Sequence, residues 1–519
     1  MDFRTLLIMF AALVGPPRGS AAAPPDAAAL ANRVDGHLAA AWSEARLAPA
    51  PLAGDAAFLR RASLDLIGRI PTVAETREFL SDPASDKRAR LIDRLLASGG
   101  YTRHWAVFWR RSWIPQTDTQ QFARLADDFE RWLAGRLRDE IGYDRLVEEL
   151  LTVPSGRAGP AQFAAHSEST TPKTFLEASE TRPENLAANA SRAFLGINLD
   201  CAQCHDHPFS RWTRDEFWQT AAFFAQPQAT SETTPVAFRL PIPDTSQVAT
   251  PKLLDGQLPA WPEQLNADTG RKLLARWTVA ADNPYFARNA ANRIWANLFG
   301  LGLIEPLDDL SGENPASHPE LLDKLTEAFK ASGFDLKYLT KALMLSKAYQ
   351  LSCAAPNGDA DSQDPSLFAS MAVRGLSGEQ LYDSLRVAAG LPVERHDLGI
   401  SPGLDARQQF ATQFRVERAS HAQRSIVQAL SLMNGELTVE LTSPEKSPTL
   451  GAVADAPFFD TRGKVDALFL AALGRPPGDD EAGPLVAYVE QRGVDGQVRK
   501  ALSDVFWSLL NSSEFNTNH

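Results

Sequence analysis

Apolar residues recur at three- and four-residue intervals along most of the chain. The clearest example is an aromatic stripe formed by Trp105, Phe108, Trp109 and Trp113. This spacing places side chains on one face of an amphipathic α-helix, and such a stripe usually faces the core. Because similar stripes follow one another over most of the sequence, the pattern predicts a mainly α-helical protein.

Capping residues set the expected helix boundaries. Thr72 and Glu75 have the spacing of a capping box. Asp86 is expected to begin the next helix, which Gly99 and Gly100 are expected to end. Further helices are predicted at residues 183–199, 271–281, 286–299, 319–332, 336–350, 465–473, 480–491 and 498–510.

Helical periodicity stops at residues 227–263, where seven prolines fall. Proline removes a backbone donor and breaks a helix. We therefore expect a Pro-rich extended or partly β segment here, in which residues 236–240 resemble a strand. The chain then divides into two helical domains, residues 23–226 and 264–519. A looser stretch at 391–419 is expected to be a long surface loop.

The first 22 residues have the order of a secretory signal peptide. Arg4 precedes an apolar run over residues 6–14, and the small residues at 20–23 offer a cleavage site. The alternative interpretation is an apolar first helix of the mature fold. The run is shorter than the roughly 20 residues that cross a bilayer, and no later segment is long and uncharged enough to do so. The sequence therefore predicts an exported protein of the periplasm or extracellular space, without a membrane span.

Charge, cysteine content and missing motifs exclude several classes of partner and function. The formal net charge is −12, and no dense run of Lys and Arg with interleaved aromatic residues occurs, so nucleic acid is not an expected partner. Three cysteines are too few for a disulfide scaffold, and Cys353 is expected to be a buried small hydrophobe. No nucleophile elbow, phosphate-binding loop or zinc-protease helix motif occurs, and the sequence assigns no enzymatic activity.

Residues 200–209 contain a C-x-x-C-H motif formed by Cys201, Cys204 and His205. In c-type haem attachment two cysteine thiols bond to the vinyl groups, and the following histidine is the proximal iron ligand. If the motif is helical, its three side chains share a face, because positions i, i+3 and i+4 are neighbours. We therefore expect covalent haem c here, with a redox or electron-transfer role and a redox partner protein.

Two other uses of the motif stay open. Cys201 and Cys204 can oxidise to a local disulfide in an exported protein. The two thiols can also bind zinc with His205 or His207, although no second ligand pair is spaced for it. In either case the protein is a non-enzymatic envelope scaffold or interaction protein. Asp206 and His207 are expected to hydrogen-bond around the site.

A distal iron ligand is not marked by local context. His207 is too close to His205 in sequence to reach the opposite face of the same porphyrin. The remaining histidines and methionines of the mature chain are Met344, Met371, Met433, His37, His104, His166, His318, His396, His421 and His519. A five-coordinate haem would favour peroxide or small-ligand chemistry over electron transfer alone.

The motif and its surroundings also resemble two known families. The first half is similar to the planctomycete cytochrome-c-like secreted domain, through Phe194-Leu195-Gly196, the C-x-x-C-H window, Trp212, Thr213 and Phe217. The second half is similar to the planctomycete-specific secreted domain that usually follows it, through Asn283-Pro284, Asn292-Arg293, His318-Pro319-Glu320 and the closing Asn511-Ser512. Both are domains of unknown function, and the cytochrome label rests on C-x-x-C-H.

The resemblance implies architecture and compartment more than activity. It implies two secreted domains in series that cover nearly all of the mature chain. Members of these families resemble parts of secreted systems that act with sulfatase-like proteins. The resemblance therefore implies a secreted sulfatase-like partner and a role in polysaccharide use.

Overall fold

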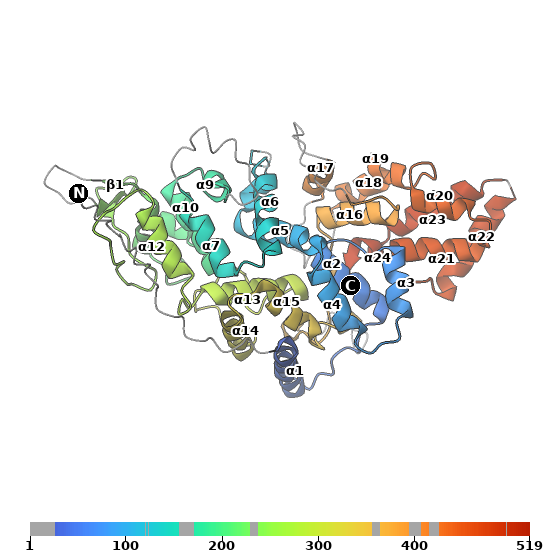
Figure 1. The fold of residues 1–519 in the computed structure, drawn as a ribbon, viewed down its shortest axis with the longest axis horizontal. Helices are drawn as coiled ribbons and strands as arrows, with labels where there is room; N and C mark the ends of the chain where they lie inside the picture. The colour runs from blue at the N-terminus through green and yellow to red at the C-terminus, as the bar shows by residue number, and fades with distance from the viewer. Residues whose placement is uncertain are drawn as a thin grey trace, which may run out of the picture.

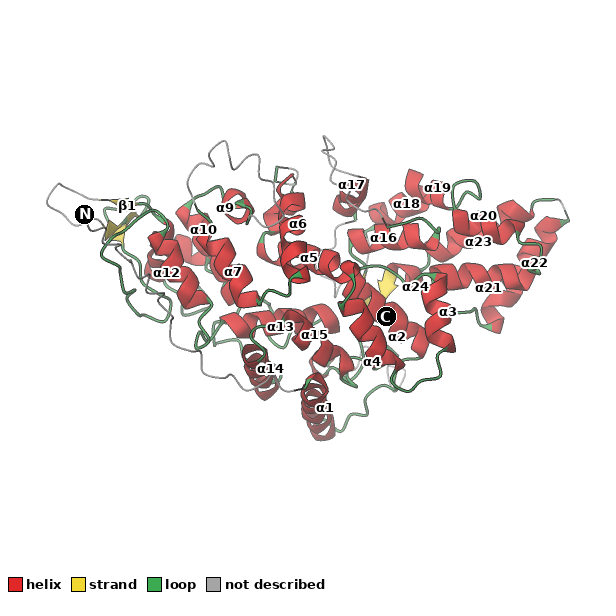
Figure 2. Ribbon diagram, in the orientation of Figure 1, coloured by secondary structure: helices red, strands yellow, loops and turns green. Residues whose placement is uncertain are grey.

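The computed structural model describes residues 26–119, 121–122, 124–154, 171–228, 237–354, 364–393, 406–414, 425–494 and 496–519. Helices fill most of this part of the chain, and its strands are short pairs (Figure 2). The predicted mainly α-helical class is confirmed. None of the described helices is long and apolar enough to cross a bilayer. The expected signal peptide, His166, His396 and His421 lie outside the described residues.

The first half of the chain contains short helices and single turns. In order they are α1 (Ala27–Glu44), α2 (Asp55–Ile67), α3 (Val73–Ser81), α4 (Lys87–Leu96), α5 (Gly99–Trp113), the 3₁₀ turn η1 (Pro115–Asp118), α6 (Arg124–Arg138), α7 (Tyr143–Thr152), α9 (Thr174–Ala178), α10 (Pro183–Ala190), the π turn η2 (Ser191–Leu195), the 3₁₀ turn η3 (Asp200–Gln203), α11 (Arg214–Ala221) and the 3₁₀ turn η4 (Ala222–Phe224).

The second half is also built from helices. They are α12 (Thr269–Thr278), α13 (Phe286–Phe299), α14 (Pro319–Ala331), α15 (Leu336–Leu345), the 3₁₀ turn η6 (Pro365–Leu367), α16 (Gly378–Ala388), α17 (Ala406–Gln413), α18 (Ile426–Asn434), α19 (Glu436–Leu441), α20 (Pro448–Asp455), α21 (Thr461–Ala472), α22 (Asp479–Gly493), α23 (Val498–Leu510) and α24 (Ser513–Asn516). The helix α17 falls within the stretch predicted as a loop, so the prediction was wrong there.

Local capping explains where several of these helices begin. Thr72 and Glu75 form the predicted capping box at the start of α3. The prediction for Gly99 and Gly100 was wrong, because they form the first turn of α5, which the Ser98 side chain caps. A serine N-cap stabilises a helix start by about 1 kcal/mol, which offsets part of the low helix propensity of the two glycines.

Two hydrophobic cores organise the helices. The first contains buried apolar residues from Ala27 to Met371, on both sides of the Pro-rich segment; α12 packs on α7, and α13 packs on α14 and η2. The second extends from Leu376 to Phe515 and includes Leu64 of α2. Figure 1 shows this second core as the orange and red end of an elongated molecule. The boundary between the two cores does not fall at the Pro-rich segment. The division into two helical domains, residues 23–226 and 264–519, stays a prediction.

Three short antiparallel strand pairs accompany the helices. They are β1 (Pro227–Gln228) with β2 (Ala237–Phe238), β3 (Leu240–Pro241) with β4 (Val248–Ala249), and β5 (Arg374–Gly375) with β6 (Thr517–Asn518). The first two pairs make the Pro-rich segment partly β, as expected. The Phe238 ring stacks on Trp261 with centroids 5.0 Å apart, so the end of the segment folds back onto its beginning.

Candidate functional site

The helix that precedes the C-x-x-C-H motif ends earlier than predicted. α10 continues into the π turn η2, and Gly196 ends it in the left-handed region, with φ of 66°. A Cβ on Gly196 would lie 2.8 Å from both Asn289 Oδ1 and Leu310 Cδ1. Only glycine fits this turn without strain, and the predicted helix over residues 183–199 therefore stops at Leu195.

Hydrogen bonds from the second half of the chain fix residues 193–198, which lead to the motif. Asn289 on α13 donates a hydrogen bond from Nδ2 to the Ala193 carbonyl at 2.9 Å. The Asn198 N–H donates to the Asp308 carbonyl, also at 2.9 Å. Because these bonds join residues from before and after the Pro-rich segment, the position of the motif depends on how the second half of the chain packs.

The motif itself forms a 3₁₀ turn. Cys201 lies in η3 and Cys204 follows it directly. Both thiols are free and exposed, whereas Ala202 between them is fully buried. Positions i and i+3 eclipse in a 3₁₀ turn, so both cysteines lie on its outer side. The expected α-helical arrangement was wrong, because Gly196 ends the helix before the motif, but the two cysteines still share a side.

His205 is exposed, and its ring Nδ1 lies 2.7 Å from the Asp206 carbonyl oxygen. A carbonyl only accepts, so Nδ1 carries the proton and donates. The lone pair on Nε2 is then free for a metal ion. A backbone carbonyl that accepts from the other ring nitrogen is a common way of orienting a histidine ligand, and the Asp206 carbonyl orients the His205 ring in the same manner.

Hydrogen bonds fold the residues after the motif into a compact loop. Asp206 Oδ1 accepts from the Arg214 N–H at the start of α11, at 2.9 Å. The His207 N–H donates to the Trp212 carbonyl at 2.8 Å, and His207 Nδ1 accepts from the Phe209 N–H at 3.2 Å. Asp206 and His207 therefore shape the loop beside the motif.

A haem and a zinc ion make different demands on these residues. Zinc needs four ligand atoms that converge at about 2.0–2.3 Å. Over the described ranges, no group of three or more His, Cys, Asp or Glu side chains is placed to hold a metal ion. A haem needs no such convergence, because the thiols bond to the ring edge and only the imidazole reaches the iron. Two outward thiols beside an imidazole with a free Nε2 meet that requirement.

The candidate distal ligands lie on other elements. His37 Nε2 is 2.9 Å from Lys324 Nζ, and His318 Nε2 is 2.9 Å from the Ser366 carbonyl oxygen. The other described candidates are His104 on α5, Met344 on α15, Met371 before β5, Met433 on α18 and His519 after β6. The second iron ligand that a haem at this motif would have therefore stays unidentified.

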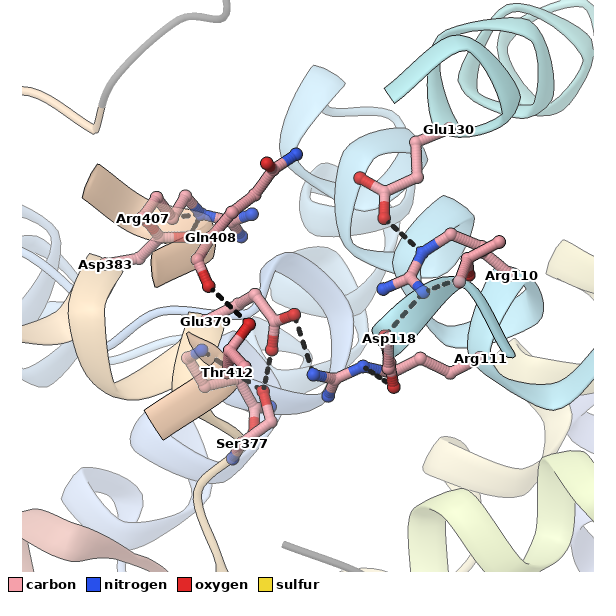
Figure 3. Close-up of polar contacts among 12 residues, drawn as sticks. Arg110, Arg111, Asp118, Glu130, Ser377, Glu379, Asp383, Arg407, Gln408 and Thr412 are labelled. Carbon is pink, nitrogen blue, oxygen red and sulfur yellow. Dashed lines mark hydrogen bonds and ion pairs between the residues drawn. The ribbon is translucent and has the colours of Figure 1, made fainter. Parts of the chain in front are cut away.

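A second cluster of polar residues, which the sequence pattern does not reveal, joins the two cores. Figure 3 shows Arg111 of α5 reaching Glu379 of α16, while the neighbouring Arg110 points to Asp118 and Glu130. Arg111 Nη2 lies 2.8 Å from Glu379 Oε1. Arg110 pairs with Asp118 at 2.6 Å and with Glu130 at 2.5 Å. Glu379 lies more than 200 positions after Arg111 in the sequence, so no local spacing marks this pair.

The carboxylates of this cluster lie beside arginine side chains that balance their charge. Burial raises the pKa of Glu379, but the Arg111 and Arg407 guanidinium groups outweigh it and lower that pKa to about 2. Burial, and secondly Arg407, lower the pKa of His104 to about 4. Arg407 also pairs with Asp383 at 2.9 Å. Because the carboxylates have basic partners, we interpret the cluster as an ionic contact between the cores.

Comparison with known proteins agrees with the resemblance seen in the sequence. Residues 33–229 match the model of PSCyt2, a protein family of unknown function (DUF1549), and residues 270–426 match that of PSD1, a second family of unknown function (DUF1553). The C-x-x-C-H motif lies within the first match. Neither the curated proteins nor the solved structures yielded a match.

Proposed function

From a chain that carries PSCyt2 and PSD1 domains in series, we infer an exported protein that binds haem c covalently through Cys201, Cys204 and His205. The observation that carries this inference is the His205 ring, whose Nδ1 donates to the Asp206 carbonyl beside two exposed free thiols. The name of the first family, PSCyt2, points the same way. Bound haem supplies one-electron chemistry at its iron.

Each residue of the motif has its own role. Cys201 and Cys204 would hold the ring edge, and His205 would supply a nitrogen ligand to the iron. Asp206 fixes the imidazole through its carbonyl and the adjoining helix through its carboxylate. The proposed role is redox, with a redox partner protein or a secreted sulfatase-like protein as the partner. An open distal position would also admit a small ligand.

The mature protein, produced with a complete cytochrome maturation system, tests this proposal. We expect one haem that survives denaturation and acid extraction. Cys201→Ala and Cys204→Ala should each weaken or abolish the attachment, and His205→Ala should change the spectrum of any haem that remains. Cys353→Ala is the matched control, because that thiol lies beside Arg61 in another part of the molecule and its loss should leave haem content unchanged.

A second candidate function is a non-enzymatic envelope scaffold or interaction protein. The placement of Cys201 and Cys204 on one side of a short turn favours it, because such a pair can also oxidise to a disulfide. Finding zinc or this disulfide, and no haem by mass, would contradict the haem proposal and support the scaffold.

The proposed export has its own test. It predicts a mature N-terminus near Ala23, and intact Met1 on the abundant folded protein would contradict export.

A further inference from the structure

The helix α18 exposes an apolar face to solvent. Ile426, Val427, Leu430 and Met433 are 80%, 71%, 53% and 38% exposed. Leu432 is the one buried residue of this helix, all of whose residues the structure describes. In Figure 1 the helix lies beside α19 at the outer edge of the second core. Single exposed apolar residues are common, but a run of them on one helix marks an interaction site.

The spacing of these residues is that of a buried helix face. Ile426, Leu430 and Met433 stand at positions i, i+4 and i+7, which lie on one side of a helix. In a surface helix this side normally packs against the core. Here Leu432 packs in the second core instead. The Trp507 indole N–H donates to the Met433 carbonyl at 3.0 Å and ties α18 to α23 in this orientation. The apolar face therefore stays outside the core of its own chain.

The exposed area is large enough to join two molecules. The four exposed residues of this face present roughly 500 Å² on each copy, within the range of patches that bind a partner. Two copies packed through this face would bury about 1,000 Å² in total, the lower limit for a specific interface. An interface of this size is typical of a reversible pair.

The charge distribution favours a second copy as the occupant. The residues of α18 include no charged side chain, whereas 22% of the whole chain is charged and its formal net charge is −12. A charged partner surface would lose its hydration against this face without gaining an ion pair. Two copies repel each other through their net charge, and an uncharged face is where this repulsion is weakest. The face is therefore complementary to itself.

The apolar stripe is also nearly symmetric about its centre. Leu430 lies four positions after Ile426 and three before Met433. In an antiparallel pair with a two-fold axis at Leu430, Ile426 of each copy meets Met433 of the other, and the two Leu430 side chains meet each other. Such a contact closes a dimer, because the same patch serves both copies.

We propose that α18 is the dimer interface of this protein, with Ile426, Leu430 and Met433 of two copies packed antiparallel around a two-fold axis. This inference goes beyond the haem proposal and does not depend on it. The full chain can therefore be tested with or without cofactor.

Sedimentation velocity of the full chain at about 1 to 100 μM tests the dimer. The wild type should pass from monomer to dimer as its concentration rises. Leu430→Asp should raise the dissociation constant at least about 100-fold, because two carboxylates would meet at the axis. Phe458→Asp is the matched control. Phe458 is 79% exposed between α20 and α21, and its change should leave the constant unaltered.

Cysteine variants test the arrangement of the two helices. Leu430→Cys should form a disulfide between two copies under mild oxidation, because a residue on a two-fold axis faces its own equivalent. Ile426→Cys should cross-link with Met433→Cys in a mixture of the two variants, and not with itself, since a disulfide needs Cα atoms within about 7 Å. Mass spectrometry of the linked peptides separates these bonds from any that the native cysteines form.

Three results would overturn the proposal. The first is a wild type that stays monomeric over this concentration range. The second is a dimer that Leu430→Asp weakens no more than Phe458→Asp does, because another surface then joins the copies. The third is self-linking of Ile426→Cys in place of the mixed pair, which would contradict the antiparallel packing.

Discussion

Arg374 donates two hydrogen bonds from Nη2 to the Asp65 carboxylate, at 2.8 and 2.9 Å, across a sequence separation of 309 residues. Both side chains are almost completely buried, with 6% and 3% exposed. Tyr349 and Asn518 also donate to this carboxylate. The pair lies where α2 meets the strands β5 and β6, which connect the first core to the second.

We expect Arg374→Met to destabilise the protein strongly. The change leaves the Asp65 charge buried without its ionic partner, and breaking a buried pair in this way costs about 3–5 kcal/mol. Denaturant unfolding measures the effect. Arg90→Met is the control, because Arg90 pairs with Asp82 at the surface and such pairs contribute at most about 1 kcal/mol. An equal loss of unfolding free energy in the two variants would contradict the larger contribution of the buried pair.

Alanine substitutions at two glycines should have opposite effects. Gly196→Ala places a Cβ in the left-handed region against Asn289 and Leu310, which should cost about 1–3 kcal/mol. Gly36→Ala meets no atom within 4 Å in the exposed middle of α1, and should stabilise by up to about 1 kcal/mol, since alanine is the better helix former. Thermal unfolding compares them. A stabilised Gly196→Ala protein would show that the turn before the motif tolerates a side chain.

Stability should fall as the pH is lowered from about 6.5 towards 4. Burial, and secondly Arg407, lower the pKa of His104 to about 4 in the folded protein. The unfolded chain then binds more protons in this range, so acid favours unfolding. The free energy of unfolding, measured at pH 7.5 and pH 4.5, should change by about 2 kcal/mol less in His104→Gln than in the wild type. Burial also lowers the pKa of His37 and His519, so part of the dependence should persist. An identical pH profile in the variant would contradict the assignment to His104.

Limited proteolysis should cut the Pro-rich segment first and leave the fragments together. Arg239 is exposed there, and exposed loops are preferred cleavage sites. The two fragments share the first core, in which α7 packs on α12 and η2 on α13. We therefore expect two bands on a denaturing gel and one peak in native size exclusion. Fragments that elute separately would show two independent domains, and first cuts within residues 319–350 would show that the segment is protected.

The sequence by itself determined the features that depend on near neighbours. The aromatic stripe ending at Trp113 predicted α5, because helical spacing puts those side chains on one face. Thr72 and Glu75 predicted the start of α3, because the capping box closes within one turn. The C-x-x-C-H motif could likewise be found from spacing alone, and so could the family resemblance that the matches to PSCyt2 and PSD1 agree with.

Only the tertiary structure decided which segments meet. Gly196 ends the helix before the motif because of its approach to Asn289 and Leu310, which lie in the second half of the chain. The first core takes helices from both sides of the Pro-rich segment, and the pair of Asp65 with Arg374 joins residues 309 positions apart. The hydrophobic effect is non-directional, and its strength depends on the apolar area buried rather than on the positions of the residues in the sequence. Helices could therefore be predicted one by one, but not the partners they pack against.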